Sequence, residues 1–307
     1  MPSKVFFSRA VLEEYSKEKT LLSKLPKLLL EAGIEDIIEE GNIVAIKIHF
    51  GVEGGFRNIR PIFVKKIVDT VKDAGGNPFL TDTWGFRHVL DAYTHGFSYS
   101  TVGAPIIPAN GIKENDFRVV KIKGLRLREV QVAGNIYDAD VLINFSHCKG
   151  HASTAYGGAI KNLAMGCTSY KTRGEIHALE NIDPSGVAIQ EALADAVKAV
   201  LSNKHRKVMH VNYVMDVMEH CDCAPYTATP IVPDIGVMVS RDVVAIDQAS
   251  LEMIDSAPPL PHPLTEKHGL KPGTNKFKLI HGKDPYVQVI AAEKLGLGSR
   301  RYELVEI

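Results

Sequence analysis

Residues 144–167 read NFSHCKGHASTAYGGAIKNLAMGC. The apolar run VLINF leads into this stretch and is typical of a buried strand in an α/β sheet. Open α/β sheets bind their ligands just beyond the carboxyl ends of their strands. Glycines let the backbone approach a ligand closely, while histidine, cysteine and lysine side chains supply metal ligands, proton transfer and charge. Together these residues predict a functional site.

Strand and helix patterns alternate on both sides of this stretch. Alternating apolar and β-branched residues predict strands, and apolar residues at helical spacing predict helices. The strands are expected at residues 4–8, 42–48, 78–81, 140–146, 207–213 and 234–240, and the helices at residues 21–32, 62–74, 187–201, 242–254 and 286–295. The alternation predicts an α/β protein with a mostly parallel sheet flanked by helices.

Two segments depart from this alternation. Residues 103–135 are rich in turn residues and contain two short strand patterns, which predict a small β hairpin insertion. Residues 257–273 are rich in proline and predict an irregular crossing or a lid. We expect residues 1–307 to form one continuous α/β unit, and a division into two packed lobes, about 1–135 and 136–307, stays open.

The amino-acid composition limits the kinds of partner and cellular location that the protein can have. The chain of 307 residues has 36 Lys and Arg against 36 Asp and Glu, so its formal net charge is zero. Without a net positive field, the composition favours neither nucleic acid nor an anionic membrane as a partner. No apolar run is long enough to cross a bilayer, and the N-terminus lacks the apolar core of a signal peptide. We therefore expect a cytoplasmic protein that binds a small anionic ligand.

Histidines and lysines of residues 144–167 are the main candidates for catalysis. We interpret His147 and His151 as proton-transfer groups or metal ligands, and Lys161 as an anion-binding or nucleophilic amine. Lys149 adds positive charge for an anionic substrate. The alternative is a polar loop followed by a lysine on a helix surface. The residues expected to hold a cofactor beside Lys161 are Gly157, Gly158 and Asn162.

Arginines and histidines also follow other predicted strands. Arg57 and Arg60 follow the strand at 42–48 and could grip a carboxylate or phosphate of the substrate with forked donors, unless they belong to a solvated loop. His49, at the end of the same strand, is either a ligand, a base or an edge histidine. The strand at 78–81 delivers Asp82, Trp84 and His88, where a carboxylate could orient an imidazole.

The cysteines suggest metal chemistry. Cys221 and Cys223 form a C-x-C pair, and thiolates at this spacing can share one metal ion or form a redox pair. Cys148 and Cys167 raise the number of cysteines to four, which is enough for an iron–sulfur cluster. The sequence leaves open whether the four sulfurs converge, and inert core cysteines are the alternative.

Several motifs resemble the uncharacterised family known as domain of unknown function 362. They are GVEGGFRNIRP, NFSHCKGH, YGGAIKNLAMGC, CDCAP and PDIGVMVSRDVVAIDQAS, which together span most of the chain. Many members of that family carry a four-cysteine ferredoxin module after the position that matches His177. This chain has no C-x-x-C-x-x-C run, so the resemblance implies no ferredoxin cluster here.

A more distant pattern consists of His151, Tyr156-Gly157-Gly158, Lys161, Gly166 and His177. This pattern resembles the nickel-pincer lactate racemase family. In that family a lysine carries a covalently attached, pyridinium-derived cofactor, a downstream histidine binds nickel and another histidine exchanges protons. The resemblance implies a cofactor on Lys161, a metal on His177 and proton transfer by His151. The acidic–arginine pair of that family has no clean match, because Arg57 and Arg60 occupy its region, so no substrate is implied.

These observations predict a metal- or metal-cofactor-dependent enzyme that moves a proton or a hydride on a small anionic metabolite, with nickel or iron as the metal. The alternative is an iron–sulfur or metal-binding protein that passes electrons to a redox partner protein or delivers metal, and there the cysteines carry the function. A weaker third hypothesis is an anion-binding module built from Lys161 and the arginine loop. A mass adduct on Lys161 would favour the first, and an absorption band lost on Cys221→Ser would favour the second.

Overall fold

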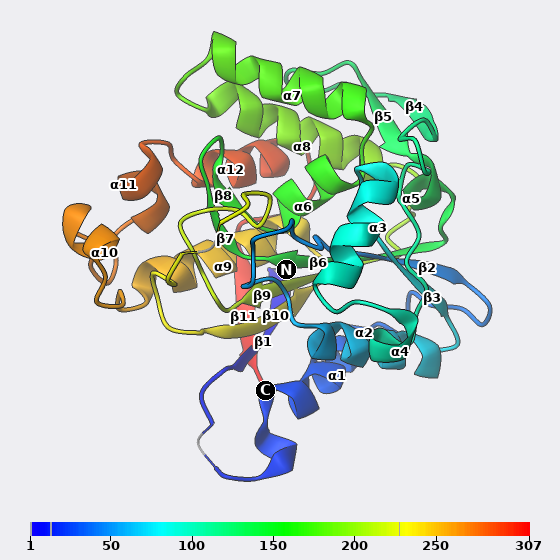
Figure 1. Ribbon diagram of the computed structural model, residues 1–307, viewed down its shortest axis with the longest axis horizontal. Helices are drawn as coiled ribbons and strands as arrows, with labels where there is room; N and C mark the ends of the chain where they lie inside the picture. Colours follow the sequence, from blue (N-terminus) through cyan, green and yellow to red (C-terminus); the bar gives the residue numbers. More distant parts are fainter. Residues whose placement is uncertain (1, 13, 227) are drawn as a thin grey trace.

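A seven-stranded sheet forms the centre of the molecule (Figure 1). The computed structural model describes residues 2–12, 14–226 and 228–307. In sheet order the strands are β11 (Tyr302–Glu306), β1 (Ser3–Arg9), β10 (Gly236–Ser240), β9 (Val208–Val214), β6 (Val141–His147), β2 (Ile43–Lys47) and β3 (Asn77–Thr81). All of them except β10 run in one direction, which confirms the predicted mostly parallel α/β sheet.

The direction of β10 follows from the segment before it. A parallel neighbour needs a connection that crosses back over the sheet, usually as a helix. The described part of residues 215–235, which joins β9 to β10, contains no helix. The chain therefore stays at the carboxyl edge of the sheet and re-enters it in the opposite direction. This segment carries the C-x-C pair.

Helices cover both faces of the sheet (Figure 1). One layer contains α1 (Leu21–Glu31), α2 (Pro61–Asp73) and α4 (Tyr99–Val102), and the other contains α6 (Ala159–Gly166), α7 (Tyr170–Ile182), α8 (Val187–Leu201), α9 (Val243–Ser256) and α12 (Tyr286–Lys294). The remaining helices are η1 (Lys17–Lys19), α3 (Gly85–Thr94), α5 (Gly134–Asp138), α10 (Pro263–Lys267) and α11 (Lys276–His281). Among the described helices, none is long and apolar enough to cross a bilayer.

The sequence of strand β6 shows why both faces of the sheet have to be covered. Every residue of its sequence VLINFSH is buried. Leu142 belongs to the apolar cluster under α6 and α8, whereas Ile143 and Phe145 belong to the cluster on the opposite face. Successive strand side chains point to opposite faces, so a run that is apolar throughout requires both faces to be covered.

Two small hairpins accompany the sheet. Strands β4 (Phe117–Lys121) and β5 (Glu129–Ala133) form the insertion predicted within 103–135. Strands β7 (Lys149–His151) and β8 (Ala155–Gly157) form a second hairpin that the sequence did not indicate. Residues 257–273 are irregular apart from α10. Strands from both sides of residue 135 are neighbours in the one sheet, and the division into two lobes stays a prediction.

Candidate functional site

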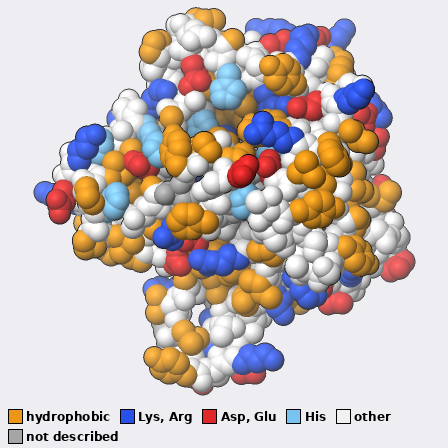
Figure 2. All heavy atoms as spheres, in the orientation of Figure 1, with side chains coloured by type: hydrophobic (Ala, Val, Ile, Leu, Met, Phe, Trp, Pro, Cys, Tyr) orange, Lys and Arg blue, Asp and Glu red, His pale blue; other side chains and the backbone are white. Residues whose placement is uncertain are grey.

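A cavity of about 510 Å³ lies at the carboxyl ends of β2, β3 and β6. On the face shown in Figure 2, histidine side chains gather around a hollow in the surface. The cavity is lined by Lys47, His49, Asp82, Thr83, Trp84, His88, Lys149, His151, Ala152, Ser153, Gly158, Lys161, Asn162, Met165, Gly166, Tyr170, Arg173, Gly174, His177, His220, Cys221, Cys223, Ala224 and Tyr226. Its position is the one that open α/β sheets use for ligands.

Residues 144–167 form one wall of this cavity. The chain leaves β6, makes the β7–β8 hairpin and enters α6. Within this hairpin, residues 149–151 pair with residues 155–157 as antiparallel strands. The predicted residues of this stretch that line the cavity are Lys149, His151, Gly158, Lys161 and Asn162, whereas His147 and Gly157 lie outside its lining.

The start of α6 depends on a glycine and a carboxylate from another helix. Asp247 of α9 accepts hydrogen bonds from the backbone N–H groups of Ala159 and Ile160, at 2.8 and 2.9 Å. A Cβ atom on Gly158 would lie 2.4 Å from the Asp247 Oδ1 atom and 2.2 Å from the Tyr156 hydroxyl oxygen. The glycine at 158 therefore leaves room for the cap that fixes α6, and α6 carries Lys161 to the cavity.

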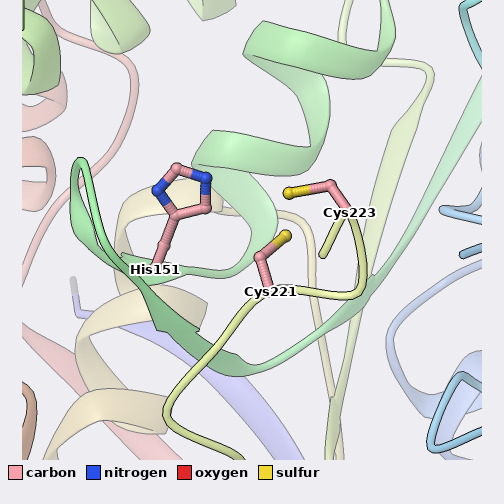
Figure 3. Close-up of side chains that lie close together, drawn as sticks. All are labelled: His151, Cys221 and Cys223. Atoms are coloured by element: carbon pink, nitrogen blue, oxygen red, sulfur yellow. The ribbon is translucent and has the colours of Figure 1, made fainter. Parts of the chain in front are cut away.

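His151, Cys221 and Cys223 converge on the cavity wall (Figure 3). One donor atom from each of them lies within 4.8 Å of the others. His151 comes from β7, and the two cysteines come from the segment between β9 and β10. Two sulfurs and an imidazole nitrogen are donors that suit soft and borderline transition metals.

The C-x-C pair is held as one thiolate and one thiol. A hydrogen bond from Cys223 and the positive charge of Lys161 hold the pKa of Cys221 well below its usual value. The same hydrogen bond raises the pKa of Cys223. The Lys161 Nζ atom lies 3.3 Å from the Cys221 Sγ atom. Although burial acts to lower the pKa of Lys161, the charge on Cys221 raises it, so the lysine is an ammonium ion.

His151 is neutral beside this pair. Burial and the charge of Lys161 lower its pKa to about 3. Its Nδ1 atom accepts a hydrogen bond from the backbone N–H of Ser153, at 3.2 Å. In a neutral imidazole the other nitrogen then carries the proton, so Nε2 is a donor in this arrangement.

A second group of donors lies in the same cavity. One donor atom each of His49, Asp82 and His88 lies within 4.8 Å of the others. The Asp82 carboxylate is 2.8 Å from His49 Nδ1, 3.1 Å from His88 Nδ1 and 3.0 Å from Lys47 Nζ. The sequence indicated the three donors but not Lys47. Lys47 is the last residue of a strand that ends at the cavity, and this position is the feature of the sequence that could have identified it.

His147 is buried away from the cavity. Its Nδ1 atom lies 2.9 Å from the Asp222 carboxylate and its Nε2 atom 2.9 Å from the Met215 carbonyl oxygen. Both nitrogens of His147 are engaged in the interior, where they contact the C-x-C segment and the end of β9, and a catalytic role for His147 stays a prediction. Asp222 also pairs with Lys149, at 3.1 Å. The sequence analysis missed Asp222, although it stands between the two cysteines.

Two of the four cysteines lie elsewhere. Cys148 and Cys167 are buried among apolar residues, and burial raises the pKa of each thiol to about 12. The Cys148 sulfur accepts a hydrogen bond from the Tyr156 hydroxyl, at 3.1 Å. Within the described residues, neither joins Cys221 and Cys223 in a group of donors. The four-sulfur convergence that was left open is absent from the described part of the chain.

Arg57 and Arg60 bind a carboxylate of the protein itself. Arg57 lies 2.8 Å and Arg60 2.6 Å from opposite oxygens of Asp216, and Arg60 also donates to the Tyr213 hydroxyl, at 2.7 Å. Neither arginine belongs to the described lining of the cavity. Their expected role in substrate binding therefore has no support from their position.

His177 reaches the cavity from α7. About half of its side chain is exposed, and its Nδ1 atom lies 3.3 Å from a carboxylate oxygen of Glu180. It is outside the donor group of His151, Cys221 and Cys223. A metal role for His177 thus stays a prediction.

Comparison with known proteins places these features in a family. The model of the family described as a domain of unknown function (DUF362) matches residues 44–252. A thylakoid-associated protein of Synechocystis sp. is 24% identical over 294 residues, which cover 90% of this chain and 85% of that protein.

Two solved structures are similar to parts of the fold. A protein from Thermotoga maritima aligns with a TM-score of 0.45 and 12% identity over 64% of this chain and 50% of its own. The lactate racemase apoprotein from Thermoanaerobacterium thermosaccharolyticum aligns with a TM-score of 0.49 and 14% identity over 70% of this chain and 51% of its own. This chain therefore spans about half the length of these two solved chains.

Proposed function

The chain belongs to the family described as a domain of unknown function (DUF362), and we propose that it is a metal- or metal-cofactor-dependent enzyme that transfers a proton or a hydride on a small anionic metabolite. The observation that carries the proposal is the convergence of His151, Cys221 and Cys223 on one wall of a cavity. Nickel and iron are among the metals that such a donor set accepts.

The charge state of the pair supports metal binding. Metals bind thiolates, and Cys221 is held as a thiolate by Cys223 and Lys161. Binding would release the proton of Cys223, and a metal at Nε2 of His151 would require the imidazole proton to move to Nδ1, in place of the hydrogen bond from Ser153. Metal affinity is therefore expected to rise with pH. The bound metal would supply Lewis-acid or redox chemistry beside the substrate.

Lys161 and His177 connect this cavity with the nickel-pincer resemblance. A cofactor joined to the Lys161 amine would begin 3.3 Å from the Cys221 sulfur, inside the cavity. His177 lines the same cavity from α7, with a side chain exposed enough to turn toward such a group. In this version of the proposal His151 is a proton-transfer group, and in the version without a cofactor it is a metal ligand.

The walls of the cavity suit a small anion. Among the described lining residues, four carry positive charge and one is a carboxylate, Asp82. The four cationic residues are Lys47, Lys149, Lys161 and Arg173. Its volume of about 510 Å³ falls in the range of small-molecule sites. The proposal includes a cytoplasmic location, where thiols such as Cys221 remain reduced.

The test is elemental analysis with an absorption spectrum on protein purified without oxygen. We expect about one nickel or iron ion for each chain, reduced at least tenfold in the double variant Cys221→Ser/Cys223→Ser and strongly reduced in His151→Ala. Cys148→Ala is the matched control, because this cysteine is buried outside the cavity. Intact-mass measurement of the same samples would detect a cofactor on Lys161.

The possible results separate the hypotheses. A single metal ion lost with the C-x-C pair but kept in Cys148→Ala would support the enzyme. Iron with sulfide, lost in the same double variant, would favour the electron-transfer or metal-delivery function. Metal content that is equal in all variants, or absent from the wild-type protein after incubation with nickel or iron, would contradict the proposed site.

A further inference from the structure

The order of the strands brings His49 and Asp82 together. Strands β2 and β3 are parallel neighbours with Lys47 opposite Thr81, and the Ile48 N–H donates to the Thr81 carbonyl at 3.2 Å. The residues that follow, His49 and Asp82, therefore leave the sheet side by side at the cavity. Parallel strands present their carboxyl ends at one edge, so this juxtaposition is a property of the sheet.

Asp82 is a buried carboxylate with four contacts. It lies near Lys47, His49 and His88 and accepts a hydrogen bond from the Thr83 N–H, at 2.8 Å. Although burial acts to raise the pKa of Asp82, Lys47 and His88 hold it well below its usual value. An ionised carboxylate only accepts hydrogen bonds, so the nearest nitrogen, His49 Nδ1 at 2.8 Å, carries a proton.

The other nitrogen of His49 is left with a lone pair. Burial lowers the pKa of His49, so the ring is neutral at pH 7 and its proton lies on Nδ1. The Nε2 atom is buried and has no hydrogen-bond partner among the described residues. Leaving a buried nitrogen without a partner is unfavourable, because the hydrogen bond it makes to water in the unfolded chain is not replaced. Since His49 lines the cavity, a ligand bound there is the available partner.

We infer that His49 is a general base that removes a proton from the ligand bound in this cavity, with Asp82 as its positioning residue. The inference rests on the proposed function and gives a catalytic role to a second wall of the same cavity. The ligand is a small anion with an acidic C–H bond at the carbon next to its carboxylate. That bond breaks, its electron pair stays on the ligand, and the proton forms the N–H bond of an imidazolium at Nε2. Asp82 stabilises the imidazolium, and the reverse step returns the proton.

The charges around His49, Asp82 and His88 favour a general base over a second metal site. Lys47 lies 3.0 Å from Asp82 and already neutralises its charge, and the Nδ1 atoms of both histidines approach the same oxygen of Asp82. The groups that face His49 come from several elements. They are Asp82 after β3, His88 from α3, and Cys221 and Asp222 from the segment between β9 and β10, while Lys47 of β2 pairs with Asp82.

The test measures proton exchange into a panel of 2-hydroxy acids. Lactate, malate and glycerate are incubated with the anaerobically purified protein in D₂O, and deuterium at the α-carbon is followed by mass spectrometry. We expect exchange with at least one acid, and a loss of roughly 10²- to 10⁴-fold in His49→Asn. The asparagine amide keeps the donor to Asp82 but has no counterpart of Nε2. His268→Asn, at the end of α10, is the control outside the cavity.

Two further readouts separate a base from a structural residue. Added imidazole should restore exchange to His49→Ala, because it supplies the missing nitrogen. In wild-type protein the rate should fall at low pH as Nε2 becomes protonated, and in Asp82→Asn this fall should move to lower pH because the imidazolium loses its carboxylate.

Metal content of the same samples distinguishes the two proposals. Full exchange in His49→Asn with bound metal would overturn the role of His49 alone, and so would the absence of exchange with every acid in the wild-type protein. Metal lost from His49→Asn or His88→Asn but retained in Cys221→Ser would reassign this group as a metal site and overturn the base. Exchange that depends on His49 in metal-free protein would support the base and contradict the metal-dependent enzyme.

Discussion

The charge state of a cysteine in this protein is decided by its nearest neighbours. Cys148 and Cys167 lie among apolar residues, where burial raises the pKa of each thiol to about 12. Cys221 is just as buried, yet the hydrogen bond from Cys223 and the ammonium of Lys161 lower its pKa. The difference matters because the thiolate is the form that binds metals and reacts as a nucleophile.

Removing either neighbour should make Cys221 less reactive. In Cys223→Ala and in Lys161→Gln the pKa of Cys221 rises, and once it exceeds the pH of the solution each further unit lowers the thiolate fraction by about tenfold. We expect the larger effect in Cys223→Ala, since its hydrogen bond is the larger cause. Alkylation of Cys221 by iodoacetamide, followed by peptide mass spectrometry, measures this. Equal rates in the wild-type protein and both variants would contradict the assignment.

At the scale of elements, the β7–β8 hairpin holds the C-x-C segment against the cavity. The Gly150 N–H donates to the Met218 carbonyl oxygen at 2.7 Å. A Cβ atom on Gly150 would lie 2.0 Å from the Glu219 carbonyl oxygen, so the two backbones approach more closely than any other residue permits. His151 follows this contact directly in β7, and Cys221 follows it two residues after Glu219 in the other segment.

Gly150→Ala should separate these two backbones. We expect a loss of about 1–3 kcal/mol in the free energy of unfolding from overpacking, together with weaker metal binding. Gly174→Ala is the matched control. A Cβ atom there meets nothing within 4 Å, and alanine in the interior of α7 should stabilise the protein by about 0.5–1 kcal/mol. Urea unfolding of both variants measures the difference, and a Gly150→Ala protein as stable as Gly174→Ala would refute this account.

At the scale of the whole molecule, buried neutral histidines link stability to pH. His210 of β9 is buried in the middle of the sheet, and its Nδ1 atom lies 3.1 Å from the Asn144 side-chain nitrogen of β6. Burial lowers its pKa from 6.5 to about 3. In the unfolded chain this histidine binds a proton below about pH 6.5. The folded protein does so only near pH 3, so stability falls as the pH drops between these values.

Replacing His210 should remove part of this dependence. Between pH 6.5 and pH 5 one such histidine costs roughly 2 kcal/mol of unfolding free energy, at about 1.4 kcal/mol for each pH unit. His210→Asn does not titrate in this range, so its stability should fall less steeply with acid. Urea unfolding at pH 7.5, 6.5 and 5 compares the slopes, and parallel curves for the two proteins would show that His210 is not the titrating group.

Local patterns were enough to predict most of the sheet and its main helices. The helix expected at residues 187–201 has the bounds of α8, and the strands expected before and after it are β6 and β9. These elements follow from the spacing of apolar residues within one window of the chain. The β7–β8 hairpin, strand β11 and helix α7 were not among the predicted elements, because the hairpin strands are only three residues long and α7 has few apolar residues to mark a helical spacing.

The amino-acid sequence alone determined that this is an α/β protein and singled out residues 144–167 as a candidate site, because strand ends, glycines and reactive side chains are local features. Only the tertiary structure decided which distant residues join that stretch. Cys221 reaches His151 because residues 215–235 stay at the carboxyl edge of the sheet, and His49 meets Asp82 because β2 and β3 are neighbours. The same strand order leaves Cys148 in the core, since contacts across a sheet depend on which strands pair and not on spacing along the chain.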